Sequence, residues 1–236
     1  MPDRIIHEEW QQQWGHEYDP KWKQGDLVPV LESLVVEGKL GTVVVDVGSG
    51  AFPISKMIDG KLRKGLKIIE LDIAAPAYET EDSIRAKIDV ENLAKKDFES
   101  RRVLVALRQW LKNKGFTTEE AVVDSAIFSD VLNYINYENV LPELLPLLKE
   151  GGRVIIFNAP RRGYKSLFRV EPKGNIDIFL LLRKLGIRLE ILKFNNTDFN
   201  TTDFPSIQSL DGQMMLYVGV KGSINSSKSG IEAGIQ

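Results

Sequence analysis

The chain has 236 residues, of which 43% are hydrophobic and 27% are charged, as in soluble globular proteins that bury a sizeable core. It contains no cysteine, which excludes disulfides, thiolate nucleophiles and thiolate-bound metals. The first residues lack the apolar core of a signal peptide, and no apolar run approaches a membrane span, so we expect a cytoplasmic protein without membrane contact.

The formal net charge is −2, and basic residues alternate with acidic ones, as in "ENLAKKDFESRR" at residues 91–102. Proteins that bind polynucleotides usually carry a clustered basic surface, because each neutralised phosphate adds affinity through counterion release. The sequence has no such cluster, so we do not expect a nucleic-acid partner.

Apolar segments alternate with helical patterns from residue 40 to residue 222. Strands are expected at 42–48, 66–73, 85–90, 121–129, 152–160, 187–194 and 212–222. Helices are expected at 53–62, 92–115, 137–152 and 176–186. This alternation predicts βαβ units and a doubly wound α/β fold with a mostly parallel, seven-stranded sheet.

The last two strands are joined by a polar, turn-rich segment without a helical pattern, so we expect them to pair antiparallel at one edge of the sheet. Residues 1–222 are expected to form a single domain with its α/β core at 40–222. Residues 223–236 lack periodicity and are expected to be a flexible tail.

The segment "VVVDVGSGAFPIS" at residues 43–55 joins the first strand to the first core helix. Glycine at 48 and 50 permits positive φ and lets a ligand approach the backbone, although a tight strand-to-helix corner needs the same residues. A dinucleotide site would have a third glycine where Pro53 stands, which argues against a nicotinamide cofactor.

An acid lies at the end of each of the first three predicted strands. Asp46, Asp72 and Asp89 would meet at the carboxyl edge of the sheet, where open α/β folds bind ligands. A carboxylate there can accept hydrogen bonds from ribose hydroxyls or from an exocyclic amine. A single acid of this kind is usually a helix cap, but three in succession favour a nucleoside-like ligand.

At residues 40–220 the sequence resembles the class I S-adenosylmethionine-dependent methyltransferases, through "VVVDVGSG", "IIELDIA", "AKIDVENL" and "VDSAIFSDVLNYINYENVLPELLPLLKEGGRVIIF". The resemblance implies a cofactor pocket in which Gly48 and Gly50 lie against methionine and ribose, with Asp46 near the amino group. It further implies Asp72 and Ile73 at the ribose, Asp89 and Val90 at the adenine, and carbonyls of Phe128 and Ser129 at the methionyl amine. Phe52 stands where the family often has a small residue.

The N-terminal segment carries Trp10, Trp14 and Trp22 in the pattern W-x-x-x-W followed by P-x-W-x-x-G. It resembles the start of the thiopurine, halide and thiol methyltransferases, in which this region forms a lid over the cofactor. The resemblance implies lid helices at 1–39, with Trp14 and Trp22 at the cofactor. A hydrophobic helix packed on the sheet is the alternative.

Methyl transfer requires a base only when the acceptor atom must lose a proton. The catalytic candidates are Asp130, His16 and Tyr134, and Asp130 is equally suited to capping the following helix. Arg161, Arg162 and Tyr164 are candidates for binding the acceptor.

We therefore expect S-adenosylmethionine-dependent methyl transfer to an O, N or S atom of a small molecule, without a metal. The alternatives are an RNA or protein methyltransferase, or a non-catalytic cofactor-binding module. The sequence does not indicate an oligomeric state.

Overall fold

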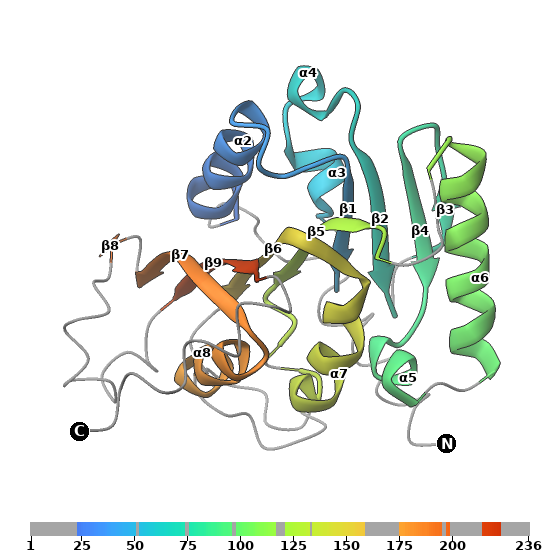
Figure 1. Ribbon diagram of the computed structural model, residues 1–236. Coiled ribbons are helices and arrows are strands. Elements are labelled where there is room, and N and C mark those ends of the chain that lie inside the picture. The colour runs from blue at the N-terminus through green and yellow to red at the C-terminus, as the bar shows by residue number, and fades with distance from the viewer. Residues whose placement is uncertain are drawn as a thin grey trace.

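The computed structural model describes residues 23–50, 52–73, 76–95, 98–116, 121–132, 134–158, 175–194, 197–198 and 214–222. The described strands form one sheet (Figure 1). They are β1 (Val43–Val47), β2 (Lys67–Asp72), β3 (Tyr78–Glu79), β4 (Ser83–Lys87), β5 (Val123–Ser129), β6 (Leu148–Asn158), β7 (Ile187–Phe194), β8 (Thr197–Asp198) and β9 (Met215–Lys221).

The sheet order is β3-β4-β2-β1-β5-β6-β9-β7-β8. Strands β4, β2, β1, β5 and β6 pair in parallel, whereas β9 is antiparallel to both β6 and β7. The seven longer strands are those expected from the sequence, and the antiparallel pairing of the last strand is confirmed. The two additional strands, β3 and β8, have two residues each and lie at opposite edges.

The described helices are the π-helix η1 (Lys23–Leu27), α2 (Val28–Val36), α3 (Ile54–Met57), α4 (Gly60–Arg63), α5 (Val90–Lys95), α6 (Phe98–Asn113), α7 (Tyr137–Leu144), the 3₁₀-helix η2 (Leu145–Leu147) and α8 (Asn175–Lys184). Helices α2, α3 and α4 lie on one face of the sheet and α5 to α8 on the other (Figure 1). None of the helices in the described ranges is long and apolar enough to cross a membrane.

Two apolar clusters, one on each face, hold these layers together. On one face Val44, Ile68 and Ile127 pack with the α2 side chains Leu31 and Leu34. On the other face, alternate residues of the same strands pack with α6, α7 and α8. All five residues of β1 are buried, as expected for a parallel strand covered on both sides.

The predicted helix at 53–62 is divided into α3 and α4. Asp59 interrupts it, because its carboxylate accepts the Lys61 N–H at 2.7 Å and so begins a new helix. Pro53 has extended backbone angles and precedes α3, so its expected place as the first helical residue is wrong by one position.

The predicted helix at 137–152 is also corrected, because α7 and η2 end at Leu147 and β6 begins at Leu148. Gly151 and Gly152, the last two residues of that predicted helix, therefore lie inside β6. A Cβ on Gly152 would lie 2.8 Å from the Lys149 carbonyl oxygen and 2.9 Å from that of Asp124, so close backbone packing requires glycine there.

Candidate functional site

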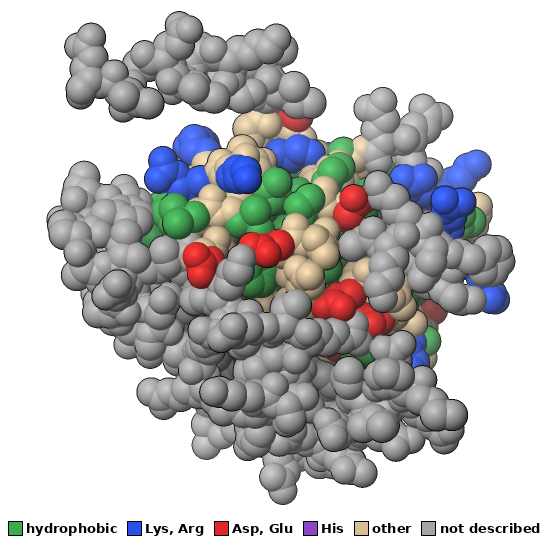
Figure 2. Space-filling model, turned by 90° about the horizontal axis from the view of Figure 1, so that it is seen from below, with side chains coloured by type: hydrophobic (Ala, Val, Ile, Leu, Met, Phe, Trp, Pro, Cys, Tyr) green, Lys and Arg blue, Asp and Glu red, His purple; other side chains and the backbone are tan. Residues whose placement is uncertain are grey.

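The carboxyl ends of β4, β2, β1 and β5 lie side by side, because these strands pair in parallel. Figure 2 views the molecule from the side toward which β1, β2 and β4 point in Figure 1. Acidic side chains lie across the middle of this face, and Lys and Arg side chains lie toward its upper margin.

The glycine turn after β1 uses its two glycines differently. Gly48 and Gly50 both have positive φ, +68° and +64°. A Cβ on Gly48 would lie 2.5 Å from Val131 Cγ2, so Gly48 is required for packing. Among the described residues, a Cβ on Gly50 would meet nothing nearer than the Gly48 carbonyl oxygen at 3.9 Å, so these residues leave room for a ligand beside Gly50.

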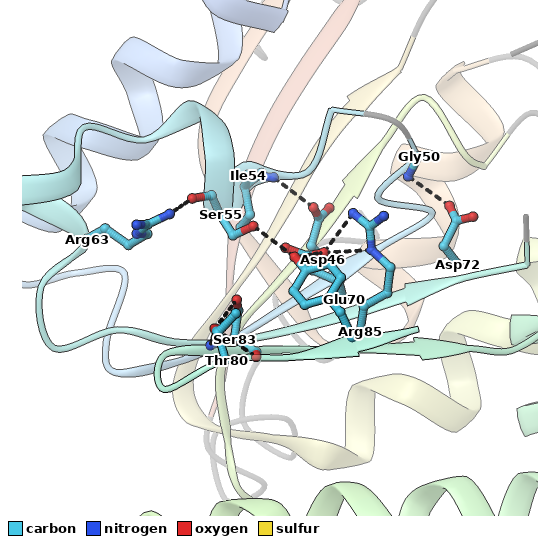
Figure 3. A network of polar contacts seen from close by, with 11 residues as sticks. Asp46, Gly50, Ile54, Ser55, Arg63, Glu70, Asp72, Thr80, Ser83 and Arg85 are labelled. Carbon is cyan, nitrogen blue, oxygen red and sulfur yellow. Dashed lines mark hydrogen bonds and ion pairs between the residues drawn. The ribbon is translucent and has the colours of Figure 1, made fainter. Parts of the chain in front are cut away.

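Two carboxylates hold the ends of this turn, as Figure 3 shows. Asp72, 7% exposed, accepts the Gly50 N–H through Oδ2 at 2.8 Å. Asp46, 1% exposed, accepts the Ile54 N–H through Oδ2 at 3.0 Å. Both acids therefore shape the turn.

The third acid, Asp89, lies two residues beyond the end of β4, which is at 83–87 and not at the expected 85–90. Its Oδ1 accepts the Glu91 N–H at 3.1 Å at the start of α5. The Ile88 N–H donates to the Asp72 carbonyl at 2.9 Å and joins the ends of β2 and β4. Val90 is buried, and Ile73, directly after β2, is partly exposed.

The end of β5 contributes Phe128, which is buried in the core, and Ser129. Asp130 follows with φ of +54°, the only positive φ at a non-glycine residue in the described chain, and its N–H donates to the Phe157 carbonyl at 2.6 Å. Helix α7 begins after Asn136, so of the two roles considered for Asp130, that of capping this helix is wrong. A left-handed backbone at such a residue stores strain, which often marks a functional position.

Two buried hydroxyls at this edge have no hydrogen-bond partner within the described part of the chain. They are Ser49 Oγ, in the glycine turn, and Ser129 Oγ, at the end of β5. An unpaired buried hydroxyl costs about 1–3 kcal/mol, so both are suited to meet a polar ligand group.

The structure thus brings together Asp46, Gly48, Gly50, Asp72, Ile73, Asp89, Val90, Phe128, Ser129 and Asp130 at one edge of the sheet. Tyr134 lies shortly after them and is partly buried. The predicted residues Trp14, His16, Trp22, Arg161, Arg162 and Tyr164 lie outside the described residues, as does the segment 223–236. No group of three or more metal-ligating side chains lies among the residues that the structure describes.

Sequence reasoning missed a buried polar network beside the turn. Glu70 and Arg85 are directly opposite each other on β2 and β4, and Glu70 Oε2 accepts from Arg85 Nε at 2.8 Å and from the Tyr78 hydroxyl at 2.6 Å. The sequence feature that could have indicated this network is a charged residue at a buried position in each of the strands "KIIELD" and "SIRAK".

No family model matches the chain, and no curated protein sequence does. Among solved structures it is similar to the Burkholderia thailandensis 1,6-didemethyltoxoflavin-N1-methyltransferase with bound 1,6-didemethyltoxoflavin and S-adenosylhomocysteine. That match has a TM-score of 0.58 and 14% identity, and it covers 93% of this chain and 88% of the other.

The chain is also similar to a geranyl diphosphate methyltransferase in complex with S-adenosylmethionine. The TM-score is 0.50 with 12% identity, and the match covers 81% of this chain and 84% of the other. At these identities the similarity establishes the fold, which is that of the class I S-adenosylmethionine-dependent methyltransferases.

Proposed function

We propose that the chain is an S-adenosylmethionine-dependent methyltransferase that methylates an O, N or S atom of a small molecule. The observation that carries the proposal is the left-handed glycine turn held between Asp46 and Asp72, beside which the described residues leave room at Gly50. It lies at the carboxyl edge of the sheet, where ligands of open α/β folds bind.

The hydrogen bonds of the turn favour this cofactor over a dinucleotide. A pyrophosphate needs free backbone N–H groups at the start of a helix. Here the Gly48 N–H donates to the Leu71 carbonyl at 2.7 Å, and the Gly50 and Ile54 N–H groups donate to carboxylates. A carboxylate at the start of α3 repels an anion and attracts the ammonium and sulfonium groups of S-adenosylmethionine.

The ribose and adenine positions follow from the acids on β2 and near β4. Asp72 would accept hydrogen bonds from the ribose hydroxyls while it holds Gly50 in place, with Ile73 beside it. Asp89 would accept from the adenine amine, and Val90 would pack against the ring. Each hydrogen bond to a carboxylate of this kind contributes roughly 1.5–3 kcal/mol.

The methionine end would lie between the turn and β5. Asp46 would attract the amino group, and carbonyls of Phe128 and Ser129 would accept its hydrogens. The hydroxyls of Ser49 and Ser129, which have no partner in the described ranges, fit a ligand with several polar groups. The residues present therefore fit the cofactor on chemical grounds.

When bound, S-adenosylmethionine supplies an activated methyl group with a good leaving group. The chain then needs mainly to hold an acceptor in line with that methyl group, and positioning of this kind lowers barriers by roughly 7–11 kcal/mol in favourable cases. Asp130, directly after β5, would accept a proton from an O or N acceptor, and Tyr134 follows four residues later. His16, the tryptophans of the lid, Arg161, Arg162 and Tyr164 remain candidates for covering the site and binding the acceptor.

Tritium transfer tests the proposal and separates it from its alternatives. The purified chain is incubated with S-adenosylmethionine labelled in its methyl group and with three acceptor pools: small metabolites, total RNA and total protein. Label in the small-molecule pool supports the proposal. Label only in RNA or protein contradicts the substrate class. Tight cofactor binding without transfer to any pool contradicts catalysis and favours a cofactor-binding module.

A further inference from the structure

The connection from β2 to β4 differs from the other parallel connections. Those from β1 to β2, from β4 to β5 and from β5 to β6 each contain a helix. Between β2 and β4, the described residues contain only the two-residue strand β3, which pairs antiparallel with β4 at the outer edge. No helix from this connection therefore covers the α3 side of β2 and β4.

A hollow of about 540 Å³ lined by polar and charged residues lies where such a helix would pack. Its lining comes from α3, α4 and the β3–β4 turn and includes Ser55, Lys56, Arg63, Tyr78, Thr80 and Ser83. Water therefore reaches close to this part of the sheet, and polar side chains buried on this face need shielding from it by something other than a helix.

What the sheet buries here is an ion pair. Glu70 is fully buried and Arg85 is 5% exposed, and Arg85 Nη2 lies 2.8 Å from Glu70 Oε2. A buried ion pair is costly to form and is favourable only when its geometry is good and further hydrogen bonds satisfy it. The side chain that shields this pair from water and bonds to it therefore affects the stability of this part of the sheet.

Tyr78 supplies that cover. Its ring centroid lies 5.0 Å from Cζ of Arg85, a cation–π contact, and its hydroxyl donates to Glu70 Oε2 at 2.6 Å. The same hydroxyl oxygen lies 3.3 Å from Ser55 Oγ. Because the carboxylate can only accept, the tyrosine proton points to Glu70 and the Ser55 hydroxyl donates to Tyr78.

The resulting chain of hydrogen bonds runs from α3 through Tyr78 to the sheet. Figure 3 shows Ser55 and the Glu70–Arg85 pair on the two sides of this connection, next to Asp46. Burial, and then the hydrogen bond to Glu70, raise the pKa of Tyr78, so the hydroxyl stays protonated as a donor at neutral pH. Such chained bonds strengthen one another in a low-dielectric setting.

Helix α3 depends on tertiary contacts of this kind. It has four residues, and no side chain caps it at Pro53. Isolated helices this short are unstable in water. The described polar contacts that hold its first turn to the sheet are the Asp46 bond to the Ile54 N–H and the Tyr78 contact with Ser55.

We propose that Tyr78 is a positioning residue that replaces the absent crossover helix: through Ser55 it holds α3, and with it the glycine turn, in the shape that receives the methyl donor. The identity of the ligand in this proposal rests on the proposed function. The effect of Tyr78 on α3 is independent of that function.

The test compares Tyr78→Phe with Tyr217→Phe. Both changes remove one hydroxyl from a tyrosine while keeping the ring, and Tyr217 is buried in the apolar cluster on the other face of the sheet, where its hydroxyl has no partner within the described part of the chain. The first readout is amide hydrogen exchange without ligand. In Tyr78→Phe the amides of Ile54 and Gly50 should exchange about tenfold faster, the ratio expected for one lost hydrogen bond, while the amides of β5 and β6 keep their rates.

The second readout is the Kd for S-adenosylmethionine, which should rise by roughly fivefold to tenfold in Tyr78→Phe and stay unchanged in Tyr217→Phe. Ser55→Ala should raise it similarly, and the double variant should be no worse than either single one, because both changes break the same chain.

Unchanged exchange at Ile54 and Gly50 would overturn the proposal whatever the ligand. Additive effects of Ser55→Ala and Tyr78→Phe on Kd would overturn the route through Ser55. A third outcome is that Tyr78→Phe speeds exchange at these amides only, while the wild-type chain does not bind S-adenosylmethionine. That outcome would refute the proposed function and still support the positioning of α3 by Tyr78.

Discussion

Replacing Asp72 by alanine separates the two tasks assigned to its carboxylate. The first is structural, the bond from the Gly50 N–H at 2.8 Å. A hydrogen bond to a charged group contributes roughly 1.5–3 kcal/mol to the free energy of unfolding. In a chain of this size each kcal/mol shifts the melting temperature by about 2–4 °C, so thermal unfolding should occur about 3–12 °C lower.

The second task is to bind the ribose. Losing hydrogen bonds of the same strength should weaken S-adenosylmethionine binding by about tenfold to a hundredfold, since 1.4 kcal/mol corresponds to a factor of ten. Both effects are measured on the same sample, by calorimetric unfolding and by calorimetric titration well below the melting temperature.

Asp124→Ala is the matched control. Asp124 Oδ2 accepts the backbone N–H groups of Thr42 at 2.9 Å and Val43 at 2.8 Å, at the opposite, amino edge of the sheet. Asp124 also pairs with Lys149 at 2.7 Å, so this variant should lose at least as much stability as Asp72→Ala while keeping its affinity. A folded Asp72→Ala variant that binds with wild-type affinity would refute the ribose assignment, and equal losses of affinity in both variants would show that the effect is not local.

Three further predictions concern other residues of the sheet and of the glycine turn. Gly50→Ala should cost about 1 kcal/mol of stability and weaken cofactor binding about tenfold or more. Gly48→Ala should fold poorly, because its Cβ would lie 2.5 Å from a neighbouring side chain. Equal stability of the two variants would contradict the different roles assigned to the two glycines. Arg85→Met should lower the free energy of unfolding by about 3–5 kcal/mol, because Glu70 stays buried without its partner, and Glu70→Leu in the same chain should restore much of the loss. Burial raises the pKa of Tyr217, so this residue contributes stability that is present below the unfolded pKa of about 10 and is lost as pH rises above it. In denaturant titrations, Tyr217→Phe should therefore lose less stability than the wild type between about pH 10 and 11. Identical pH profiles of the two proteins would contradict the burial argument.

The order of elements and the glycine turn were predictable from the sequence because they depend on local patterns. Nearly continuous apolar runs mark parallel strands, and glycines after a strand mark a turn with positive φ. The spacing of Asp46 and Asp72 placed both acids at one edge, since adjacent parallel strands end together. Nothing in that spacing indicates that both carboxylates also bind the backbone of the turn.

The remaining features depend on contacts between distant residues. The side chain of Asp59 divides one predicted helix into two, and close packing against β5 requires Gly152 inside a strand where the end of a helix was predicted. The pairing of Glu70 with Arg85 depends on strand register, and the role of Tyr78 depends on a connection whose described residues form no helix. Periodicity alone carries no information on either.

Calorimetric titration of the purified wild-type chain with S-adenosylmethionine and, in parallel, with NAD tests the proposed cofactor site most directly. We predict micromolar binding of S-adenosylmethionine and no binding of NAD, because the N–H groups of the turn are already bonded and carboxylates lie where a pyrophosphate would need donors. Binding of NAD, or of neither compound, would contradict the assignment of the glycine turn as a site for a methyl donor.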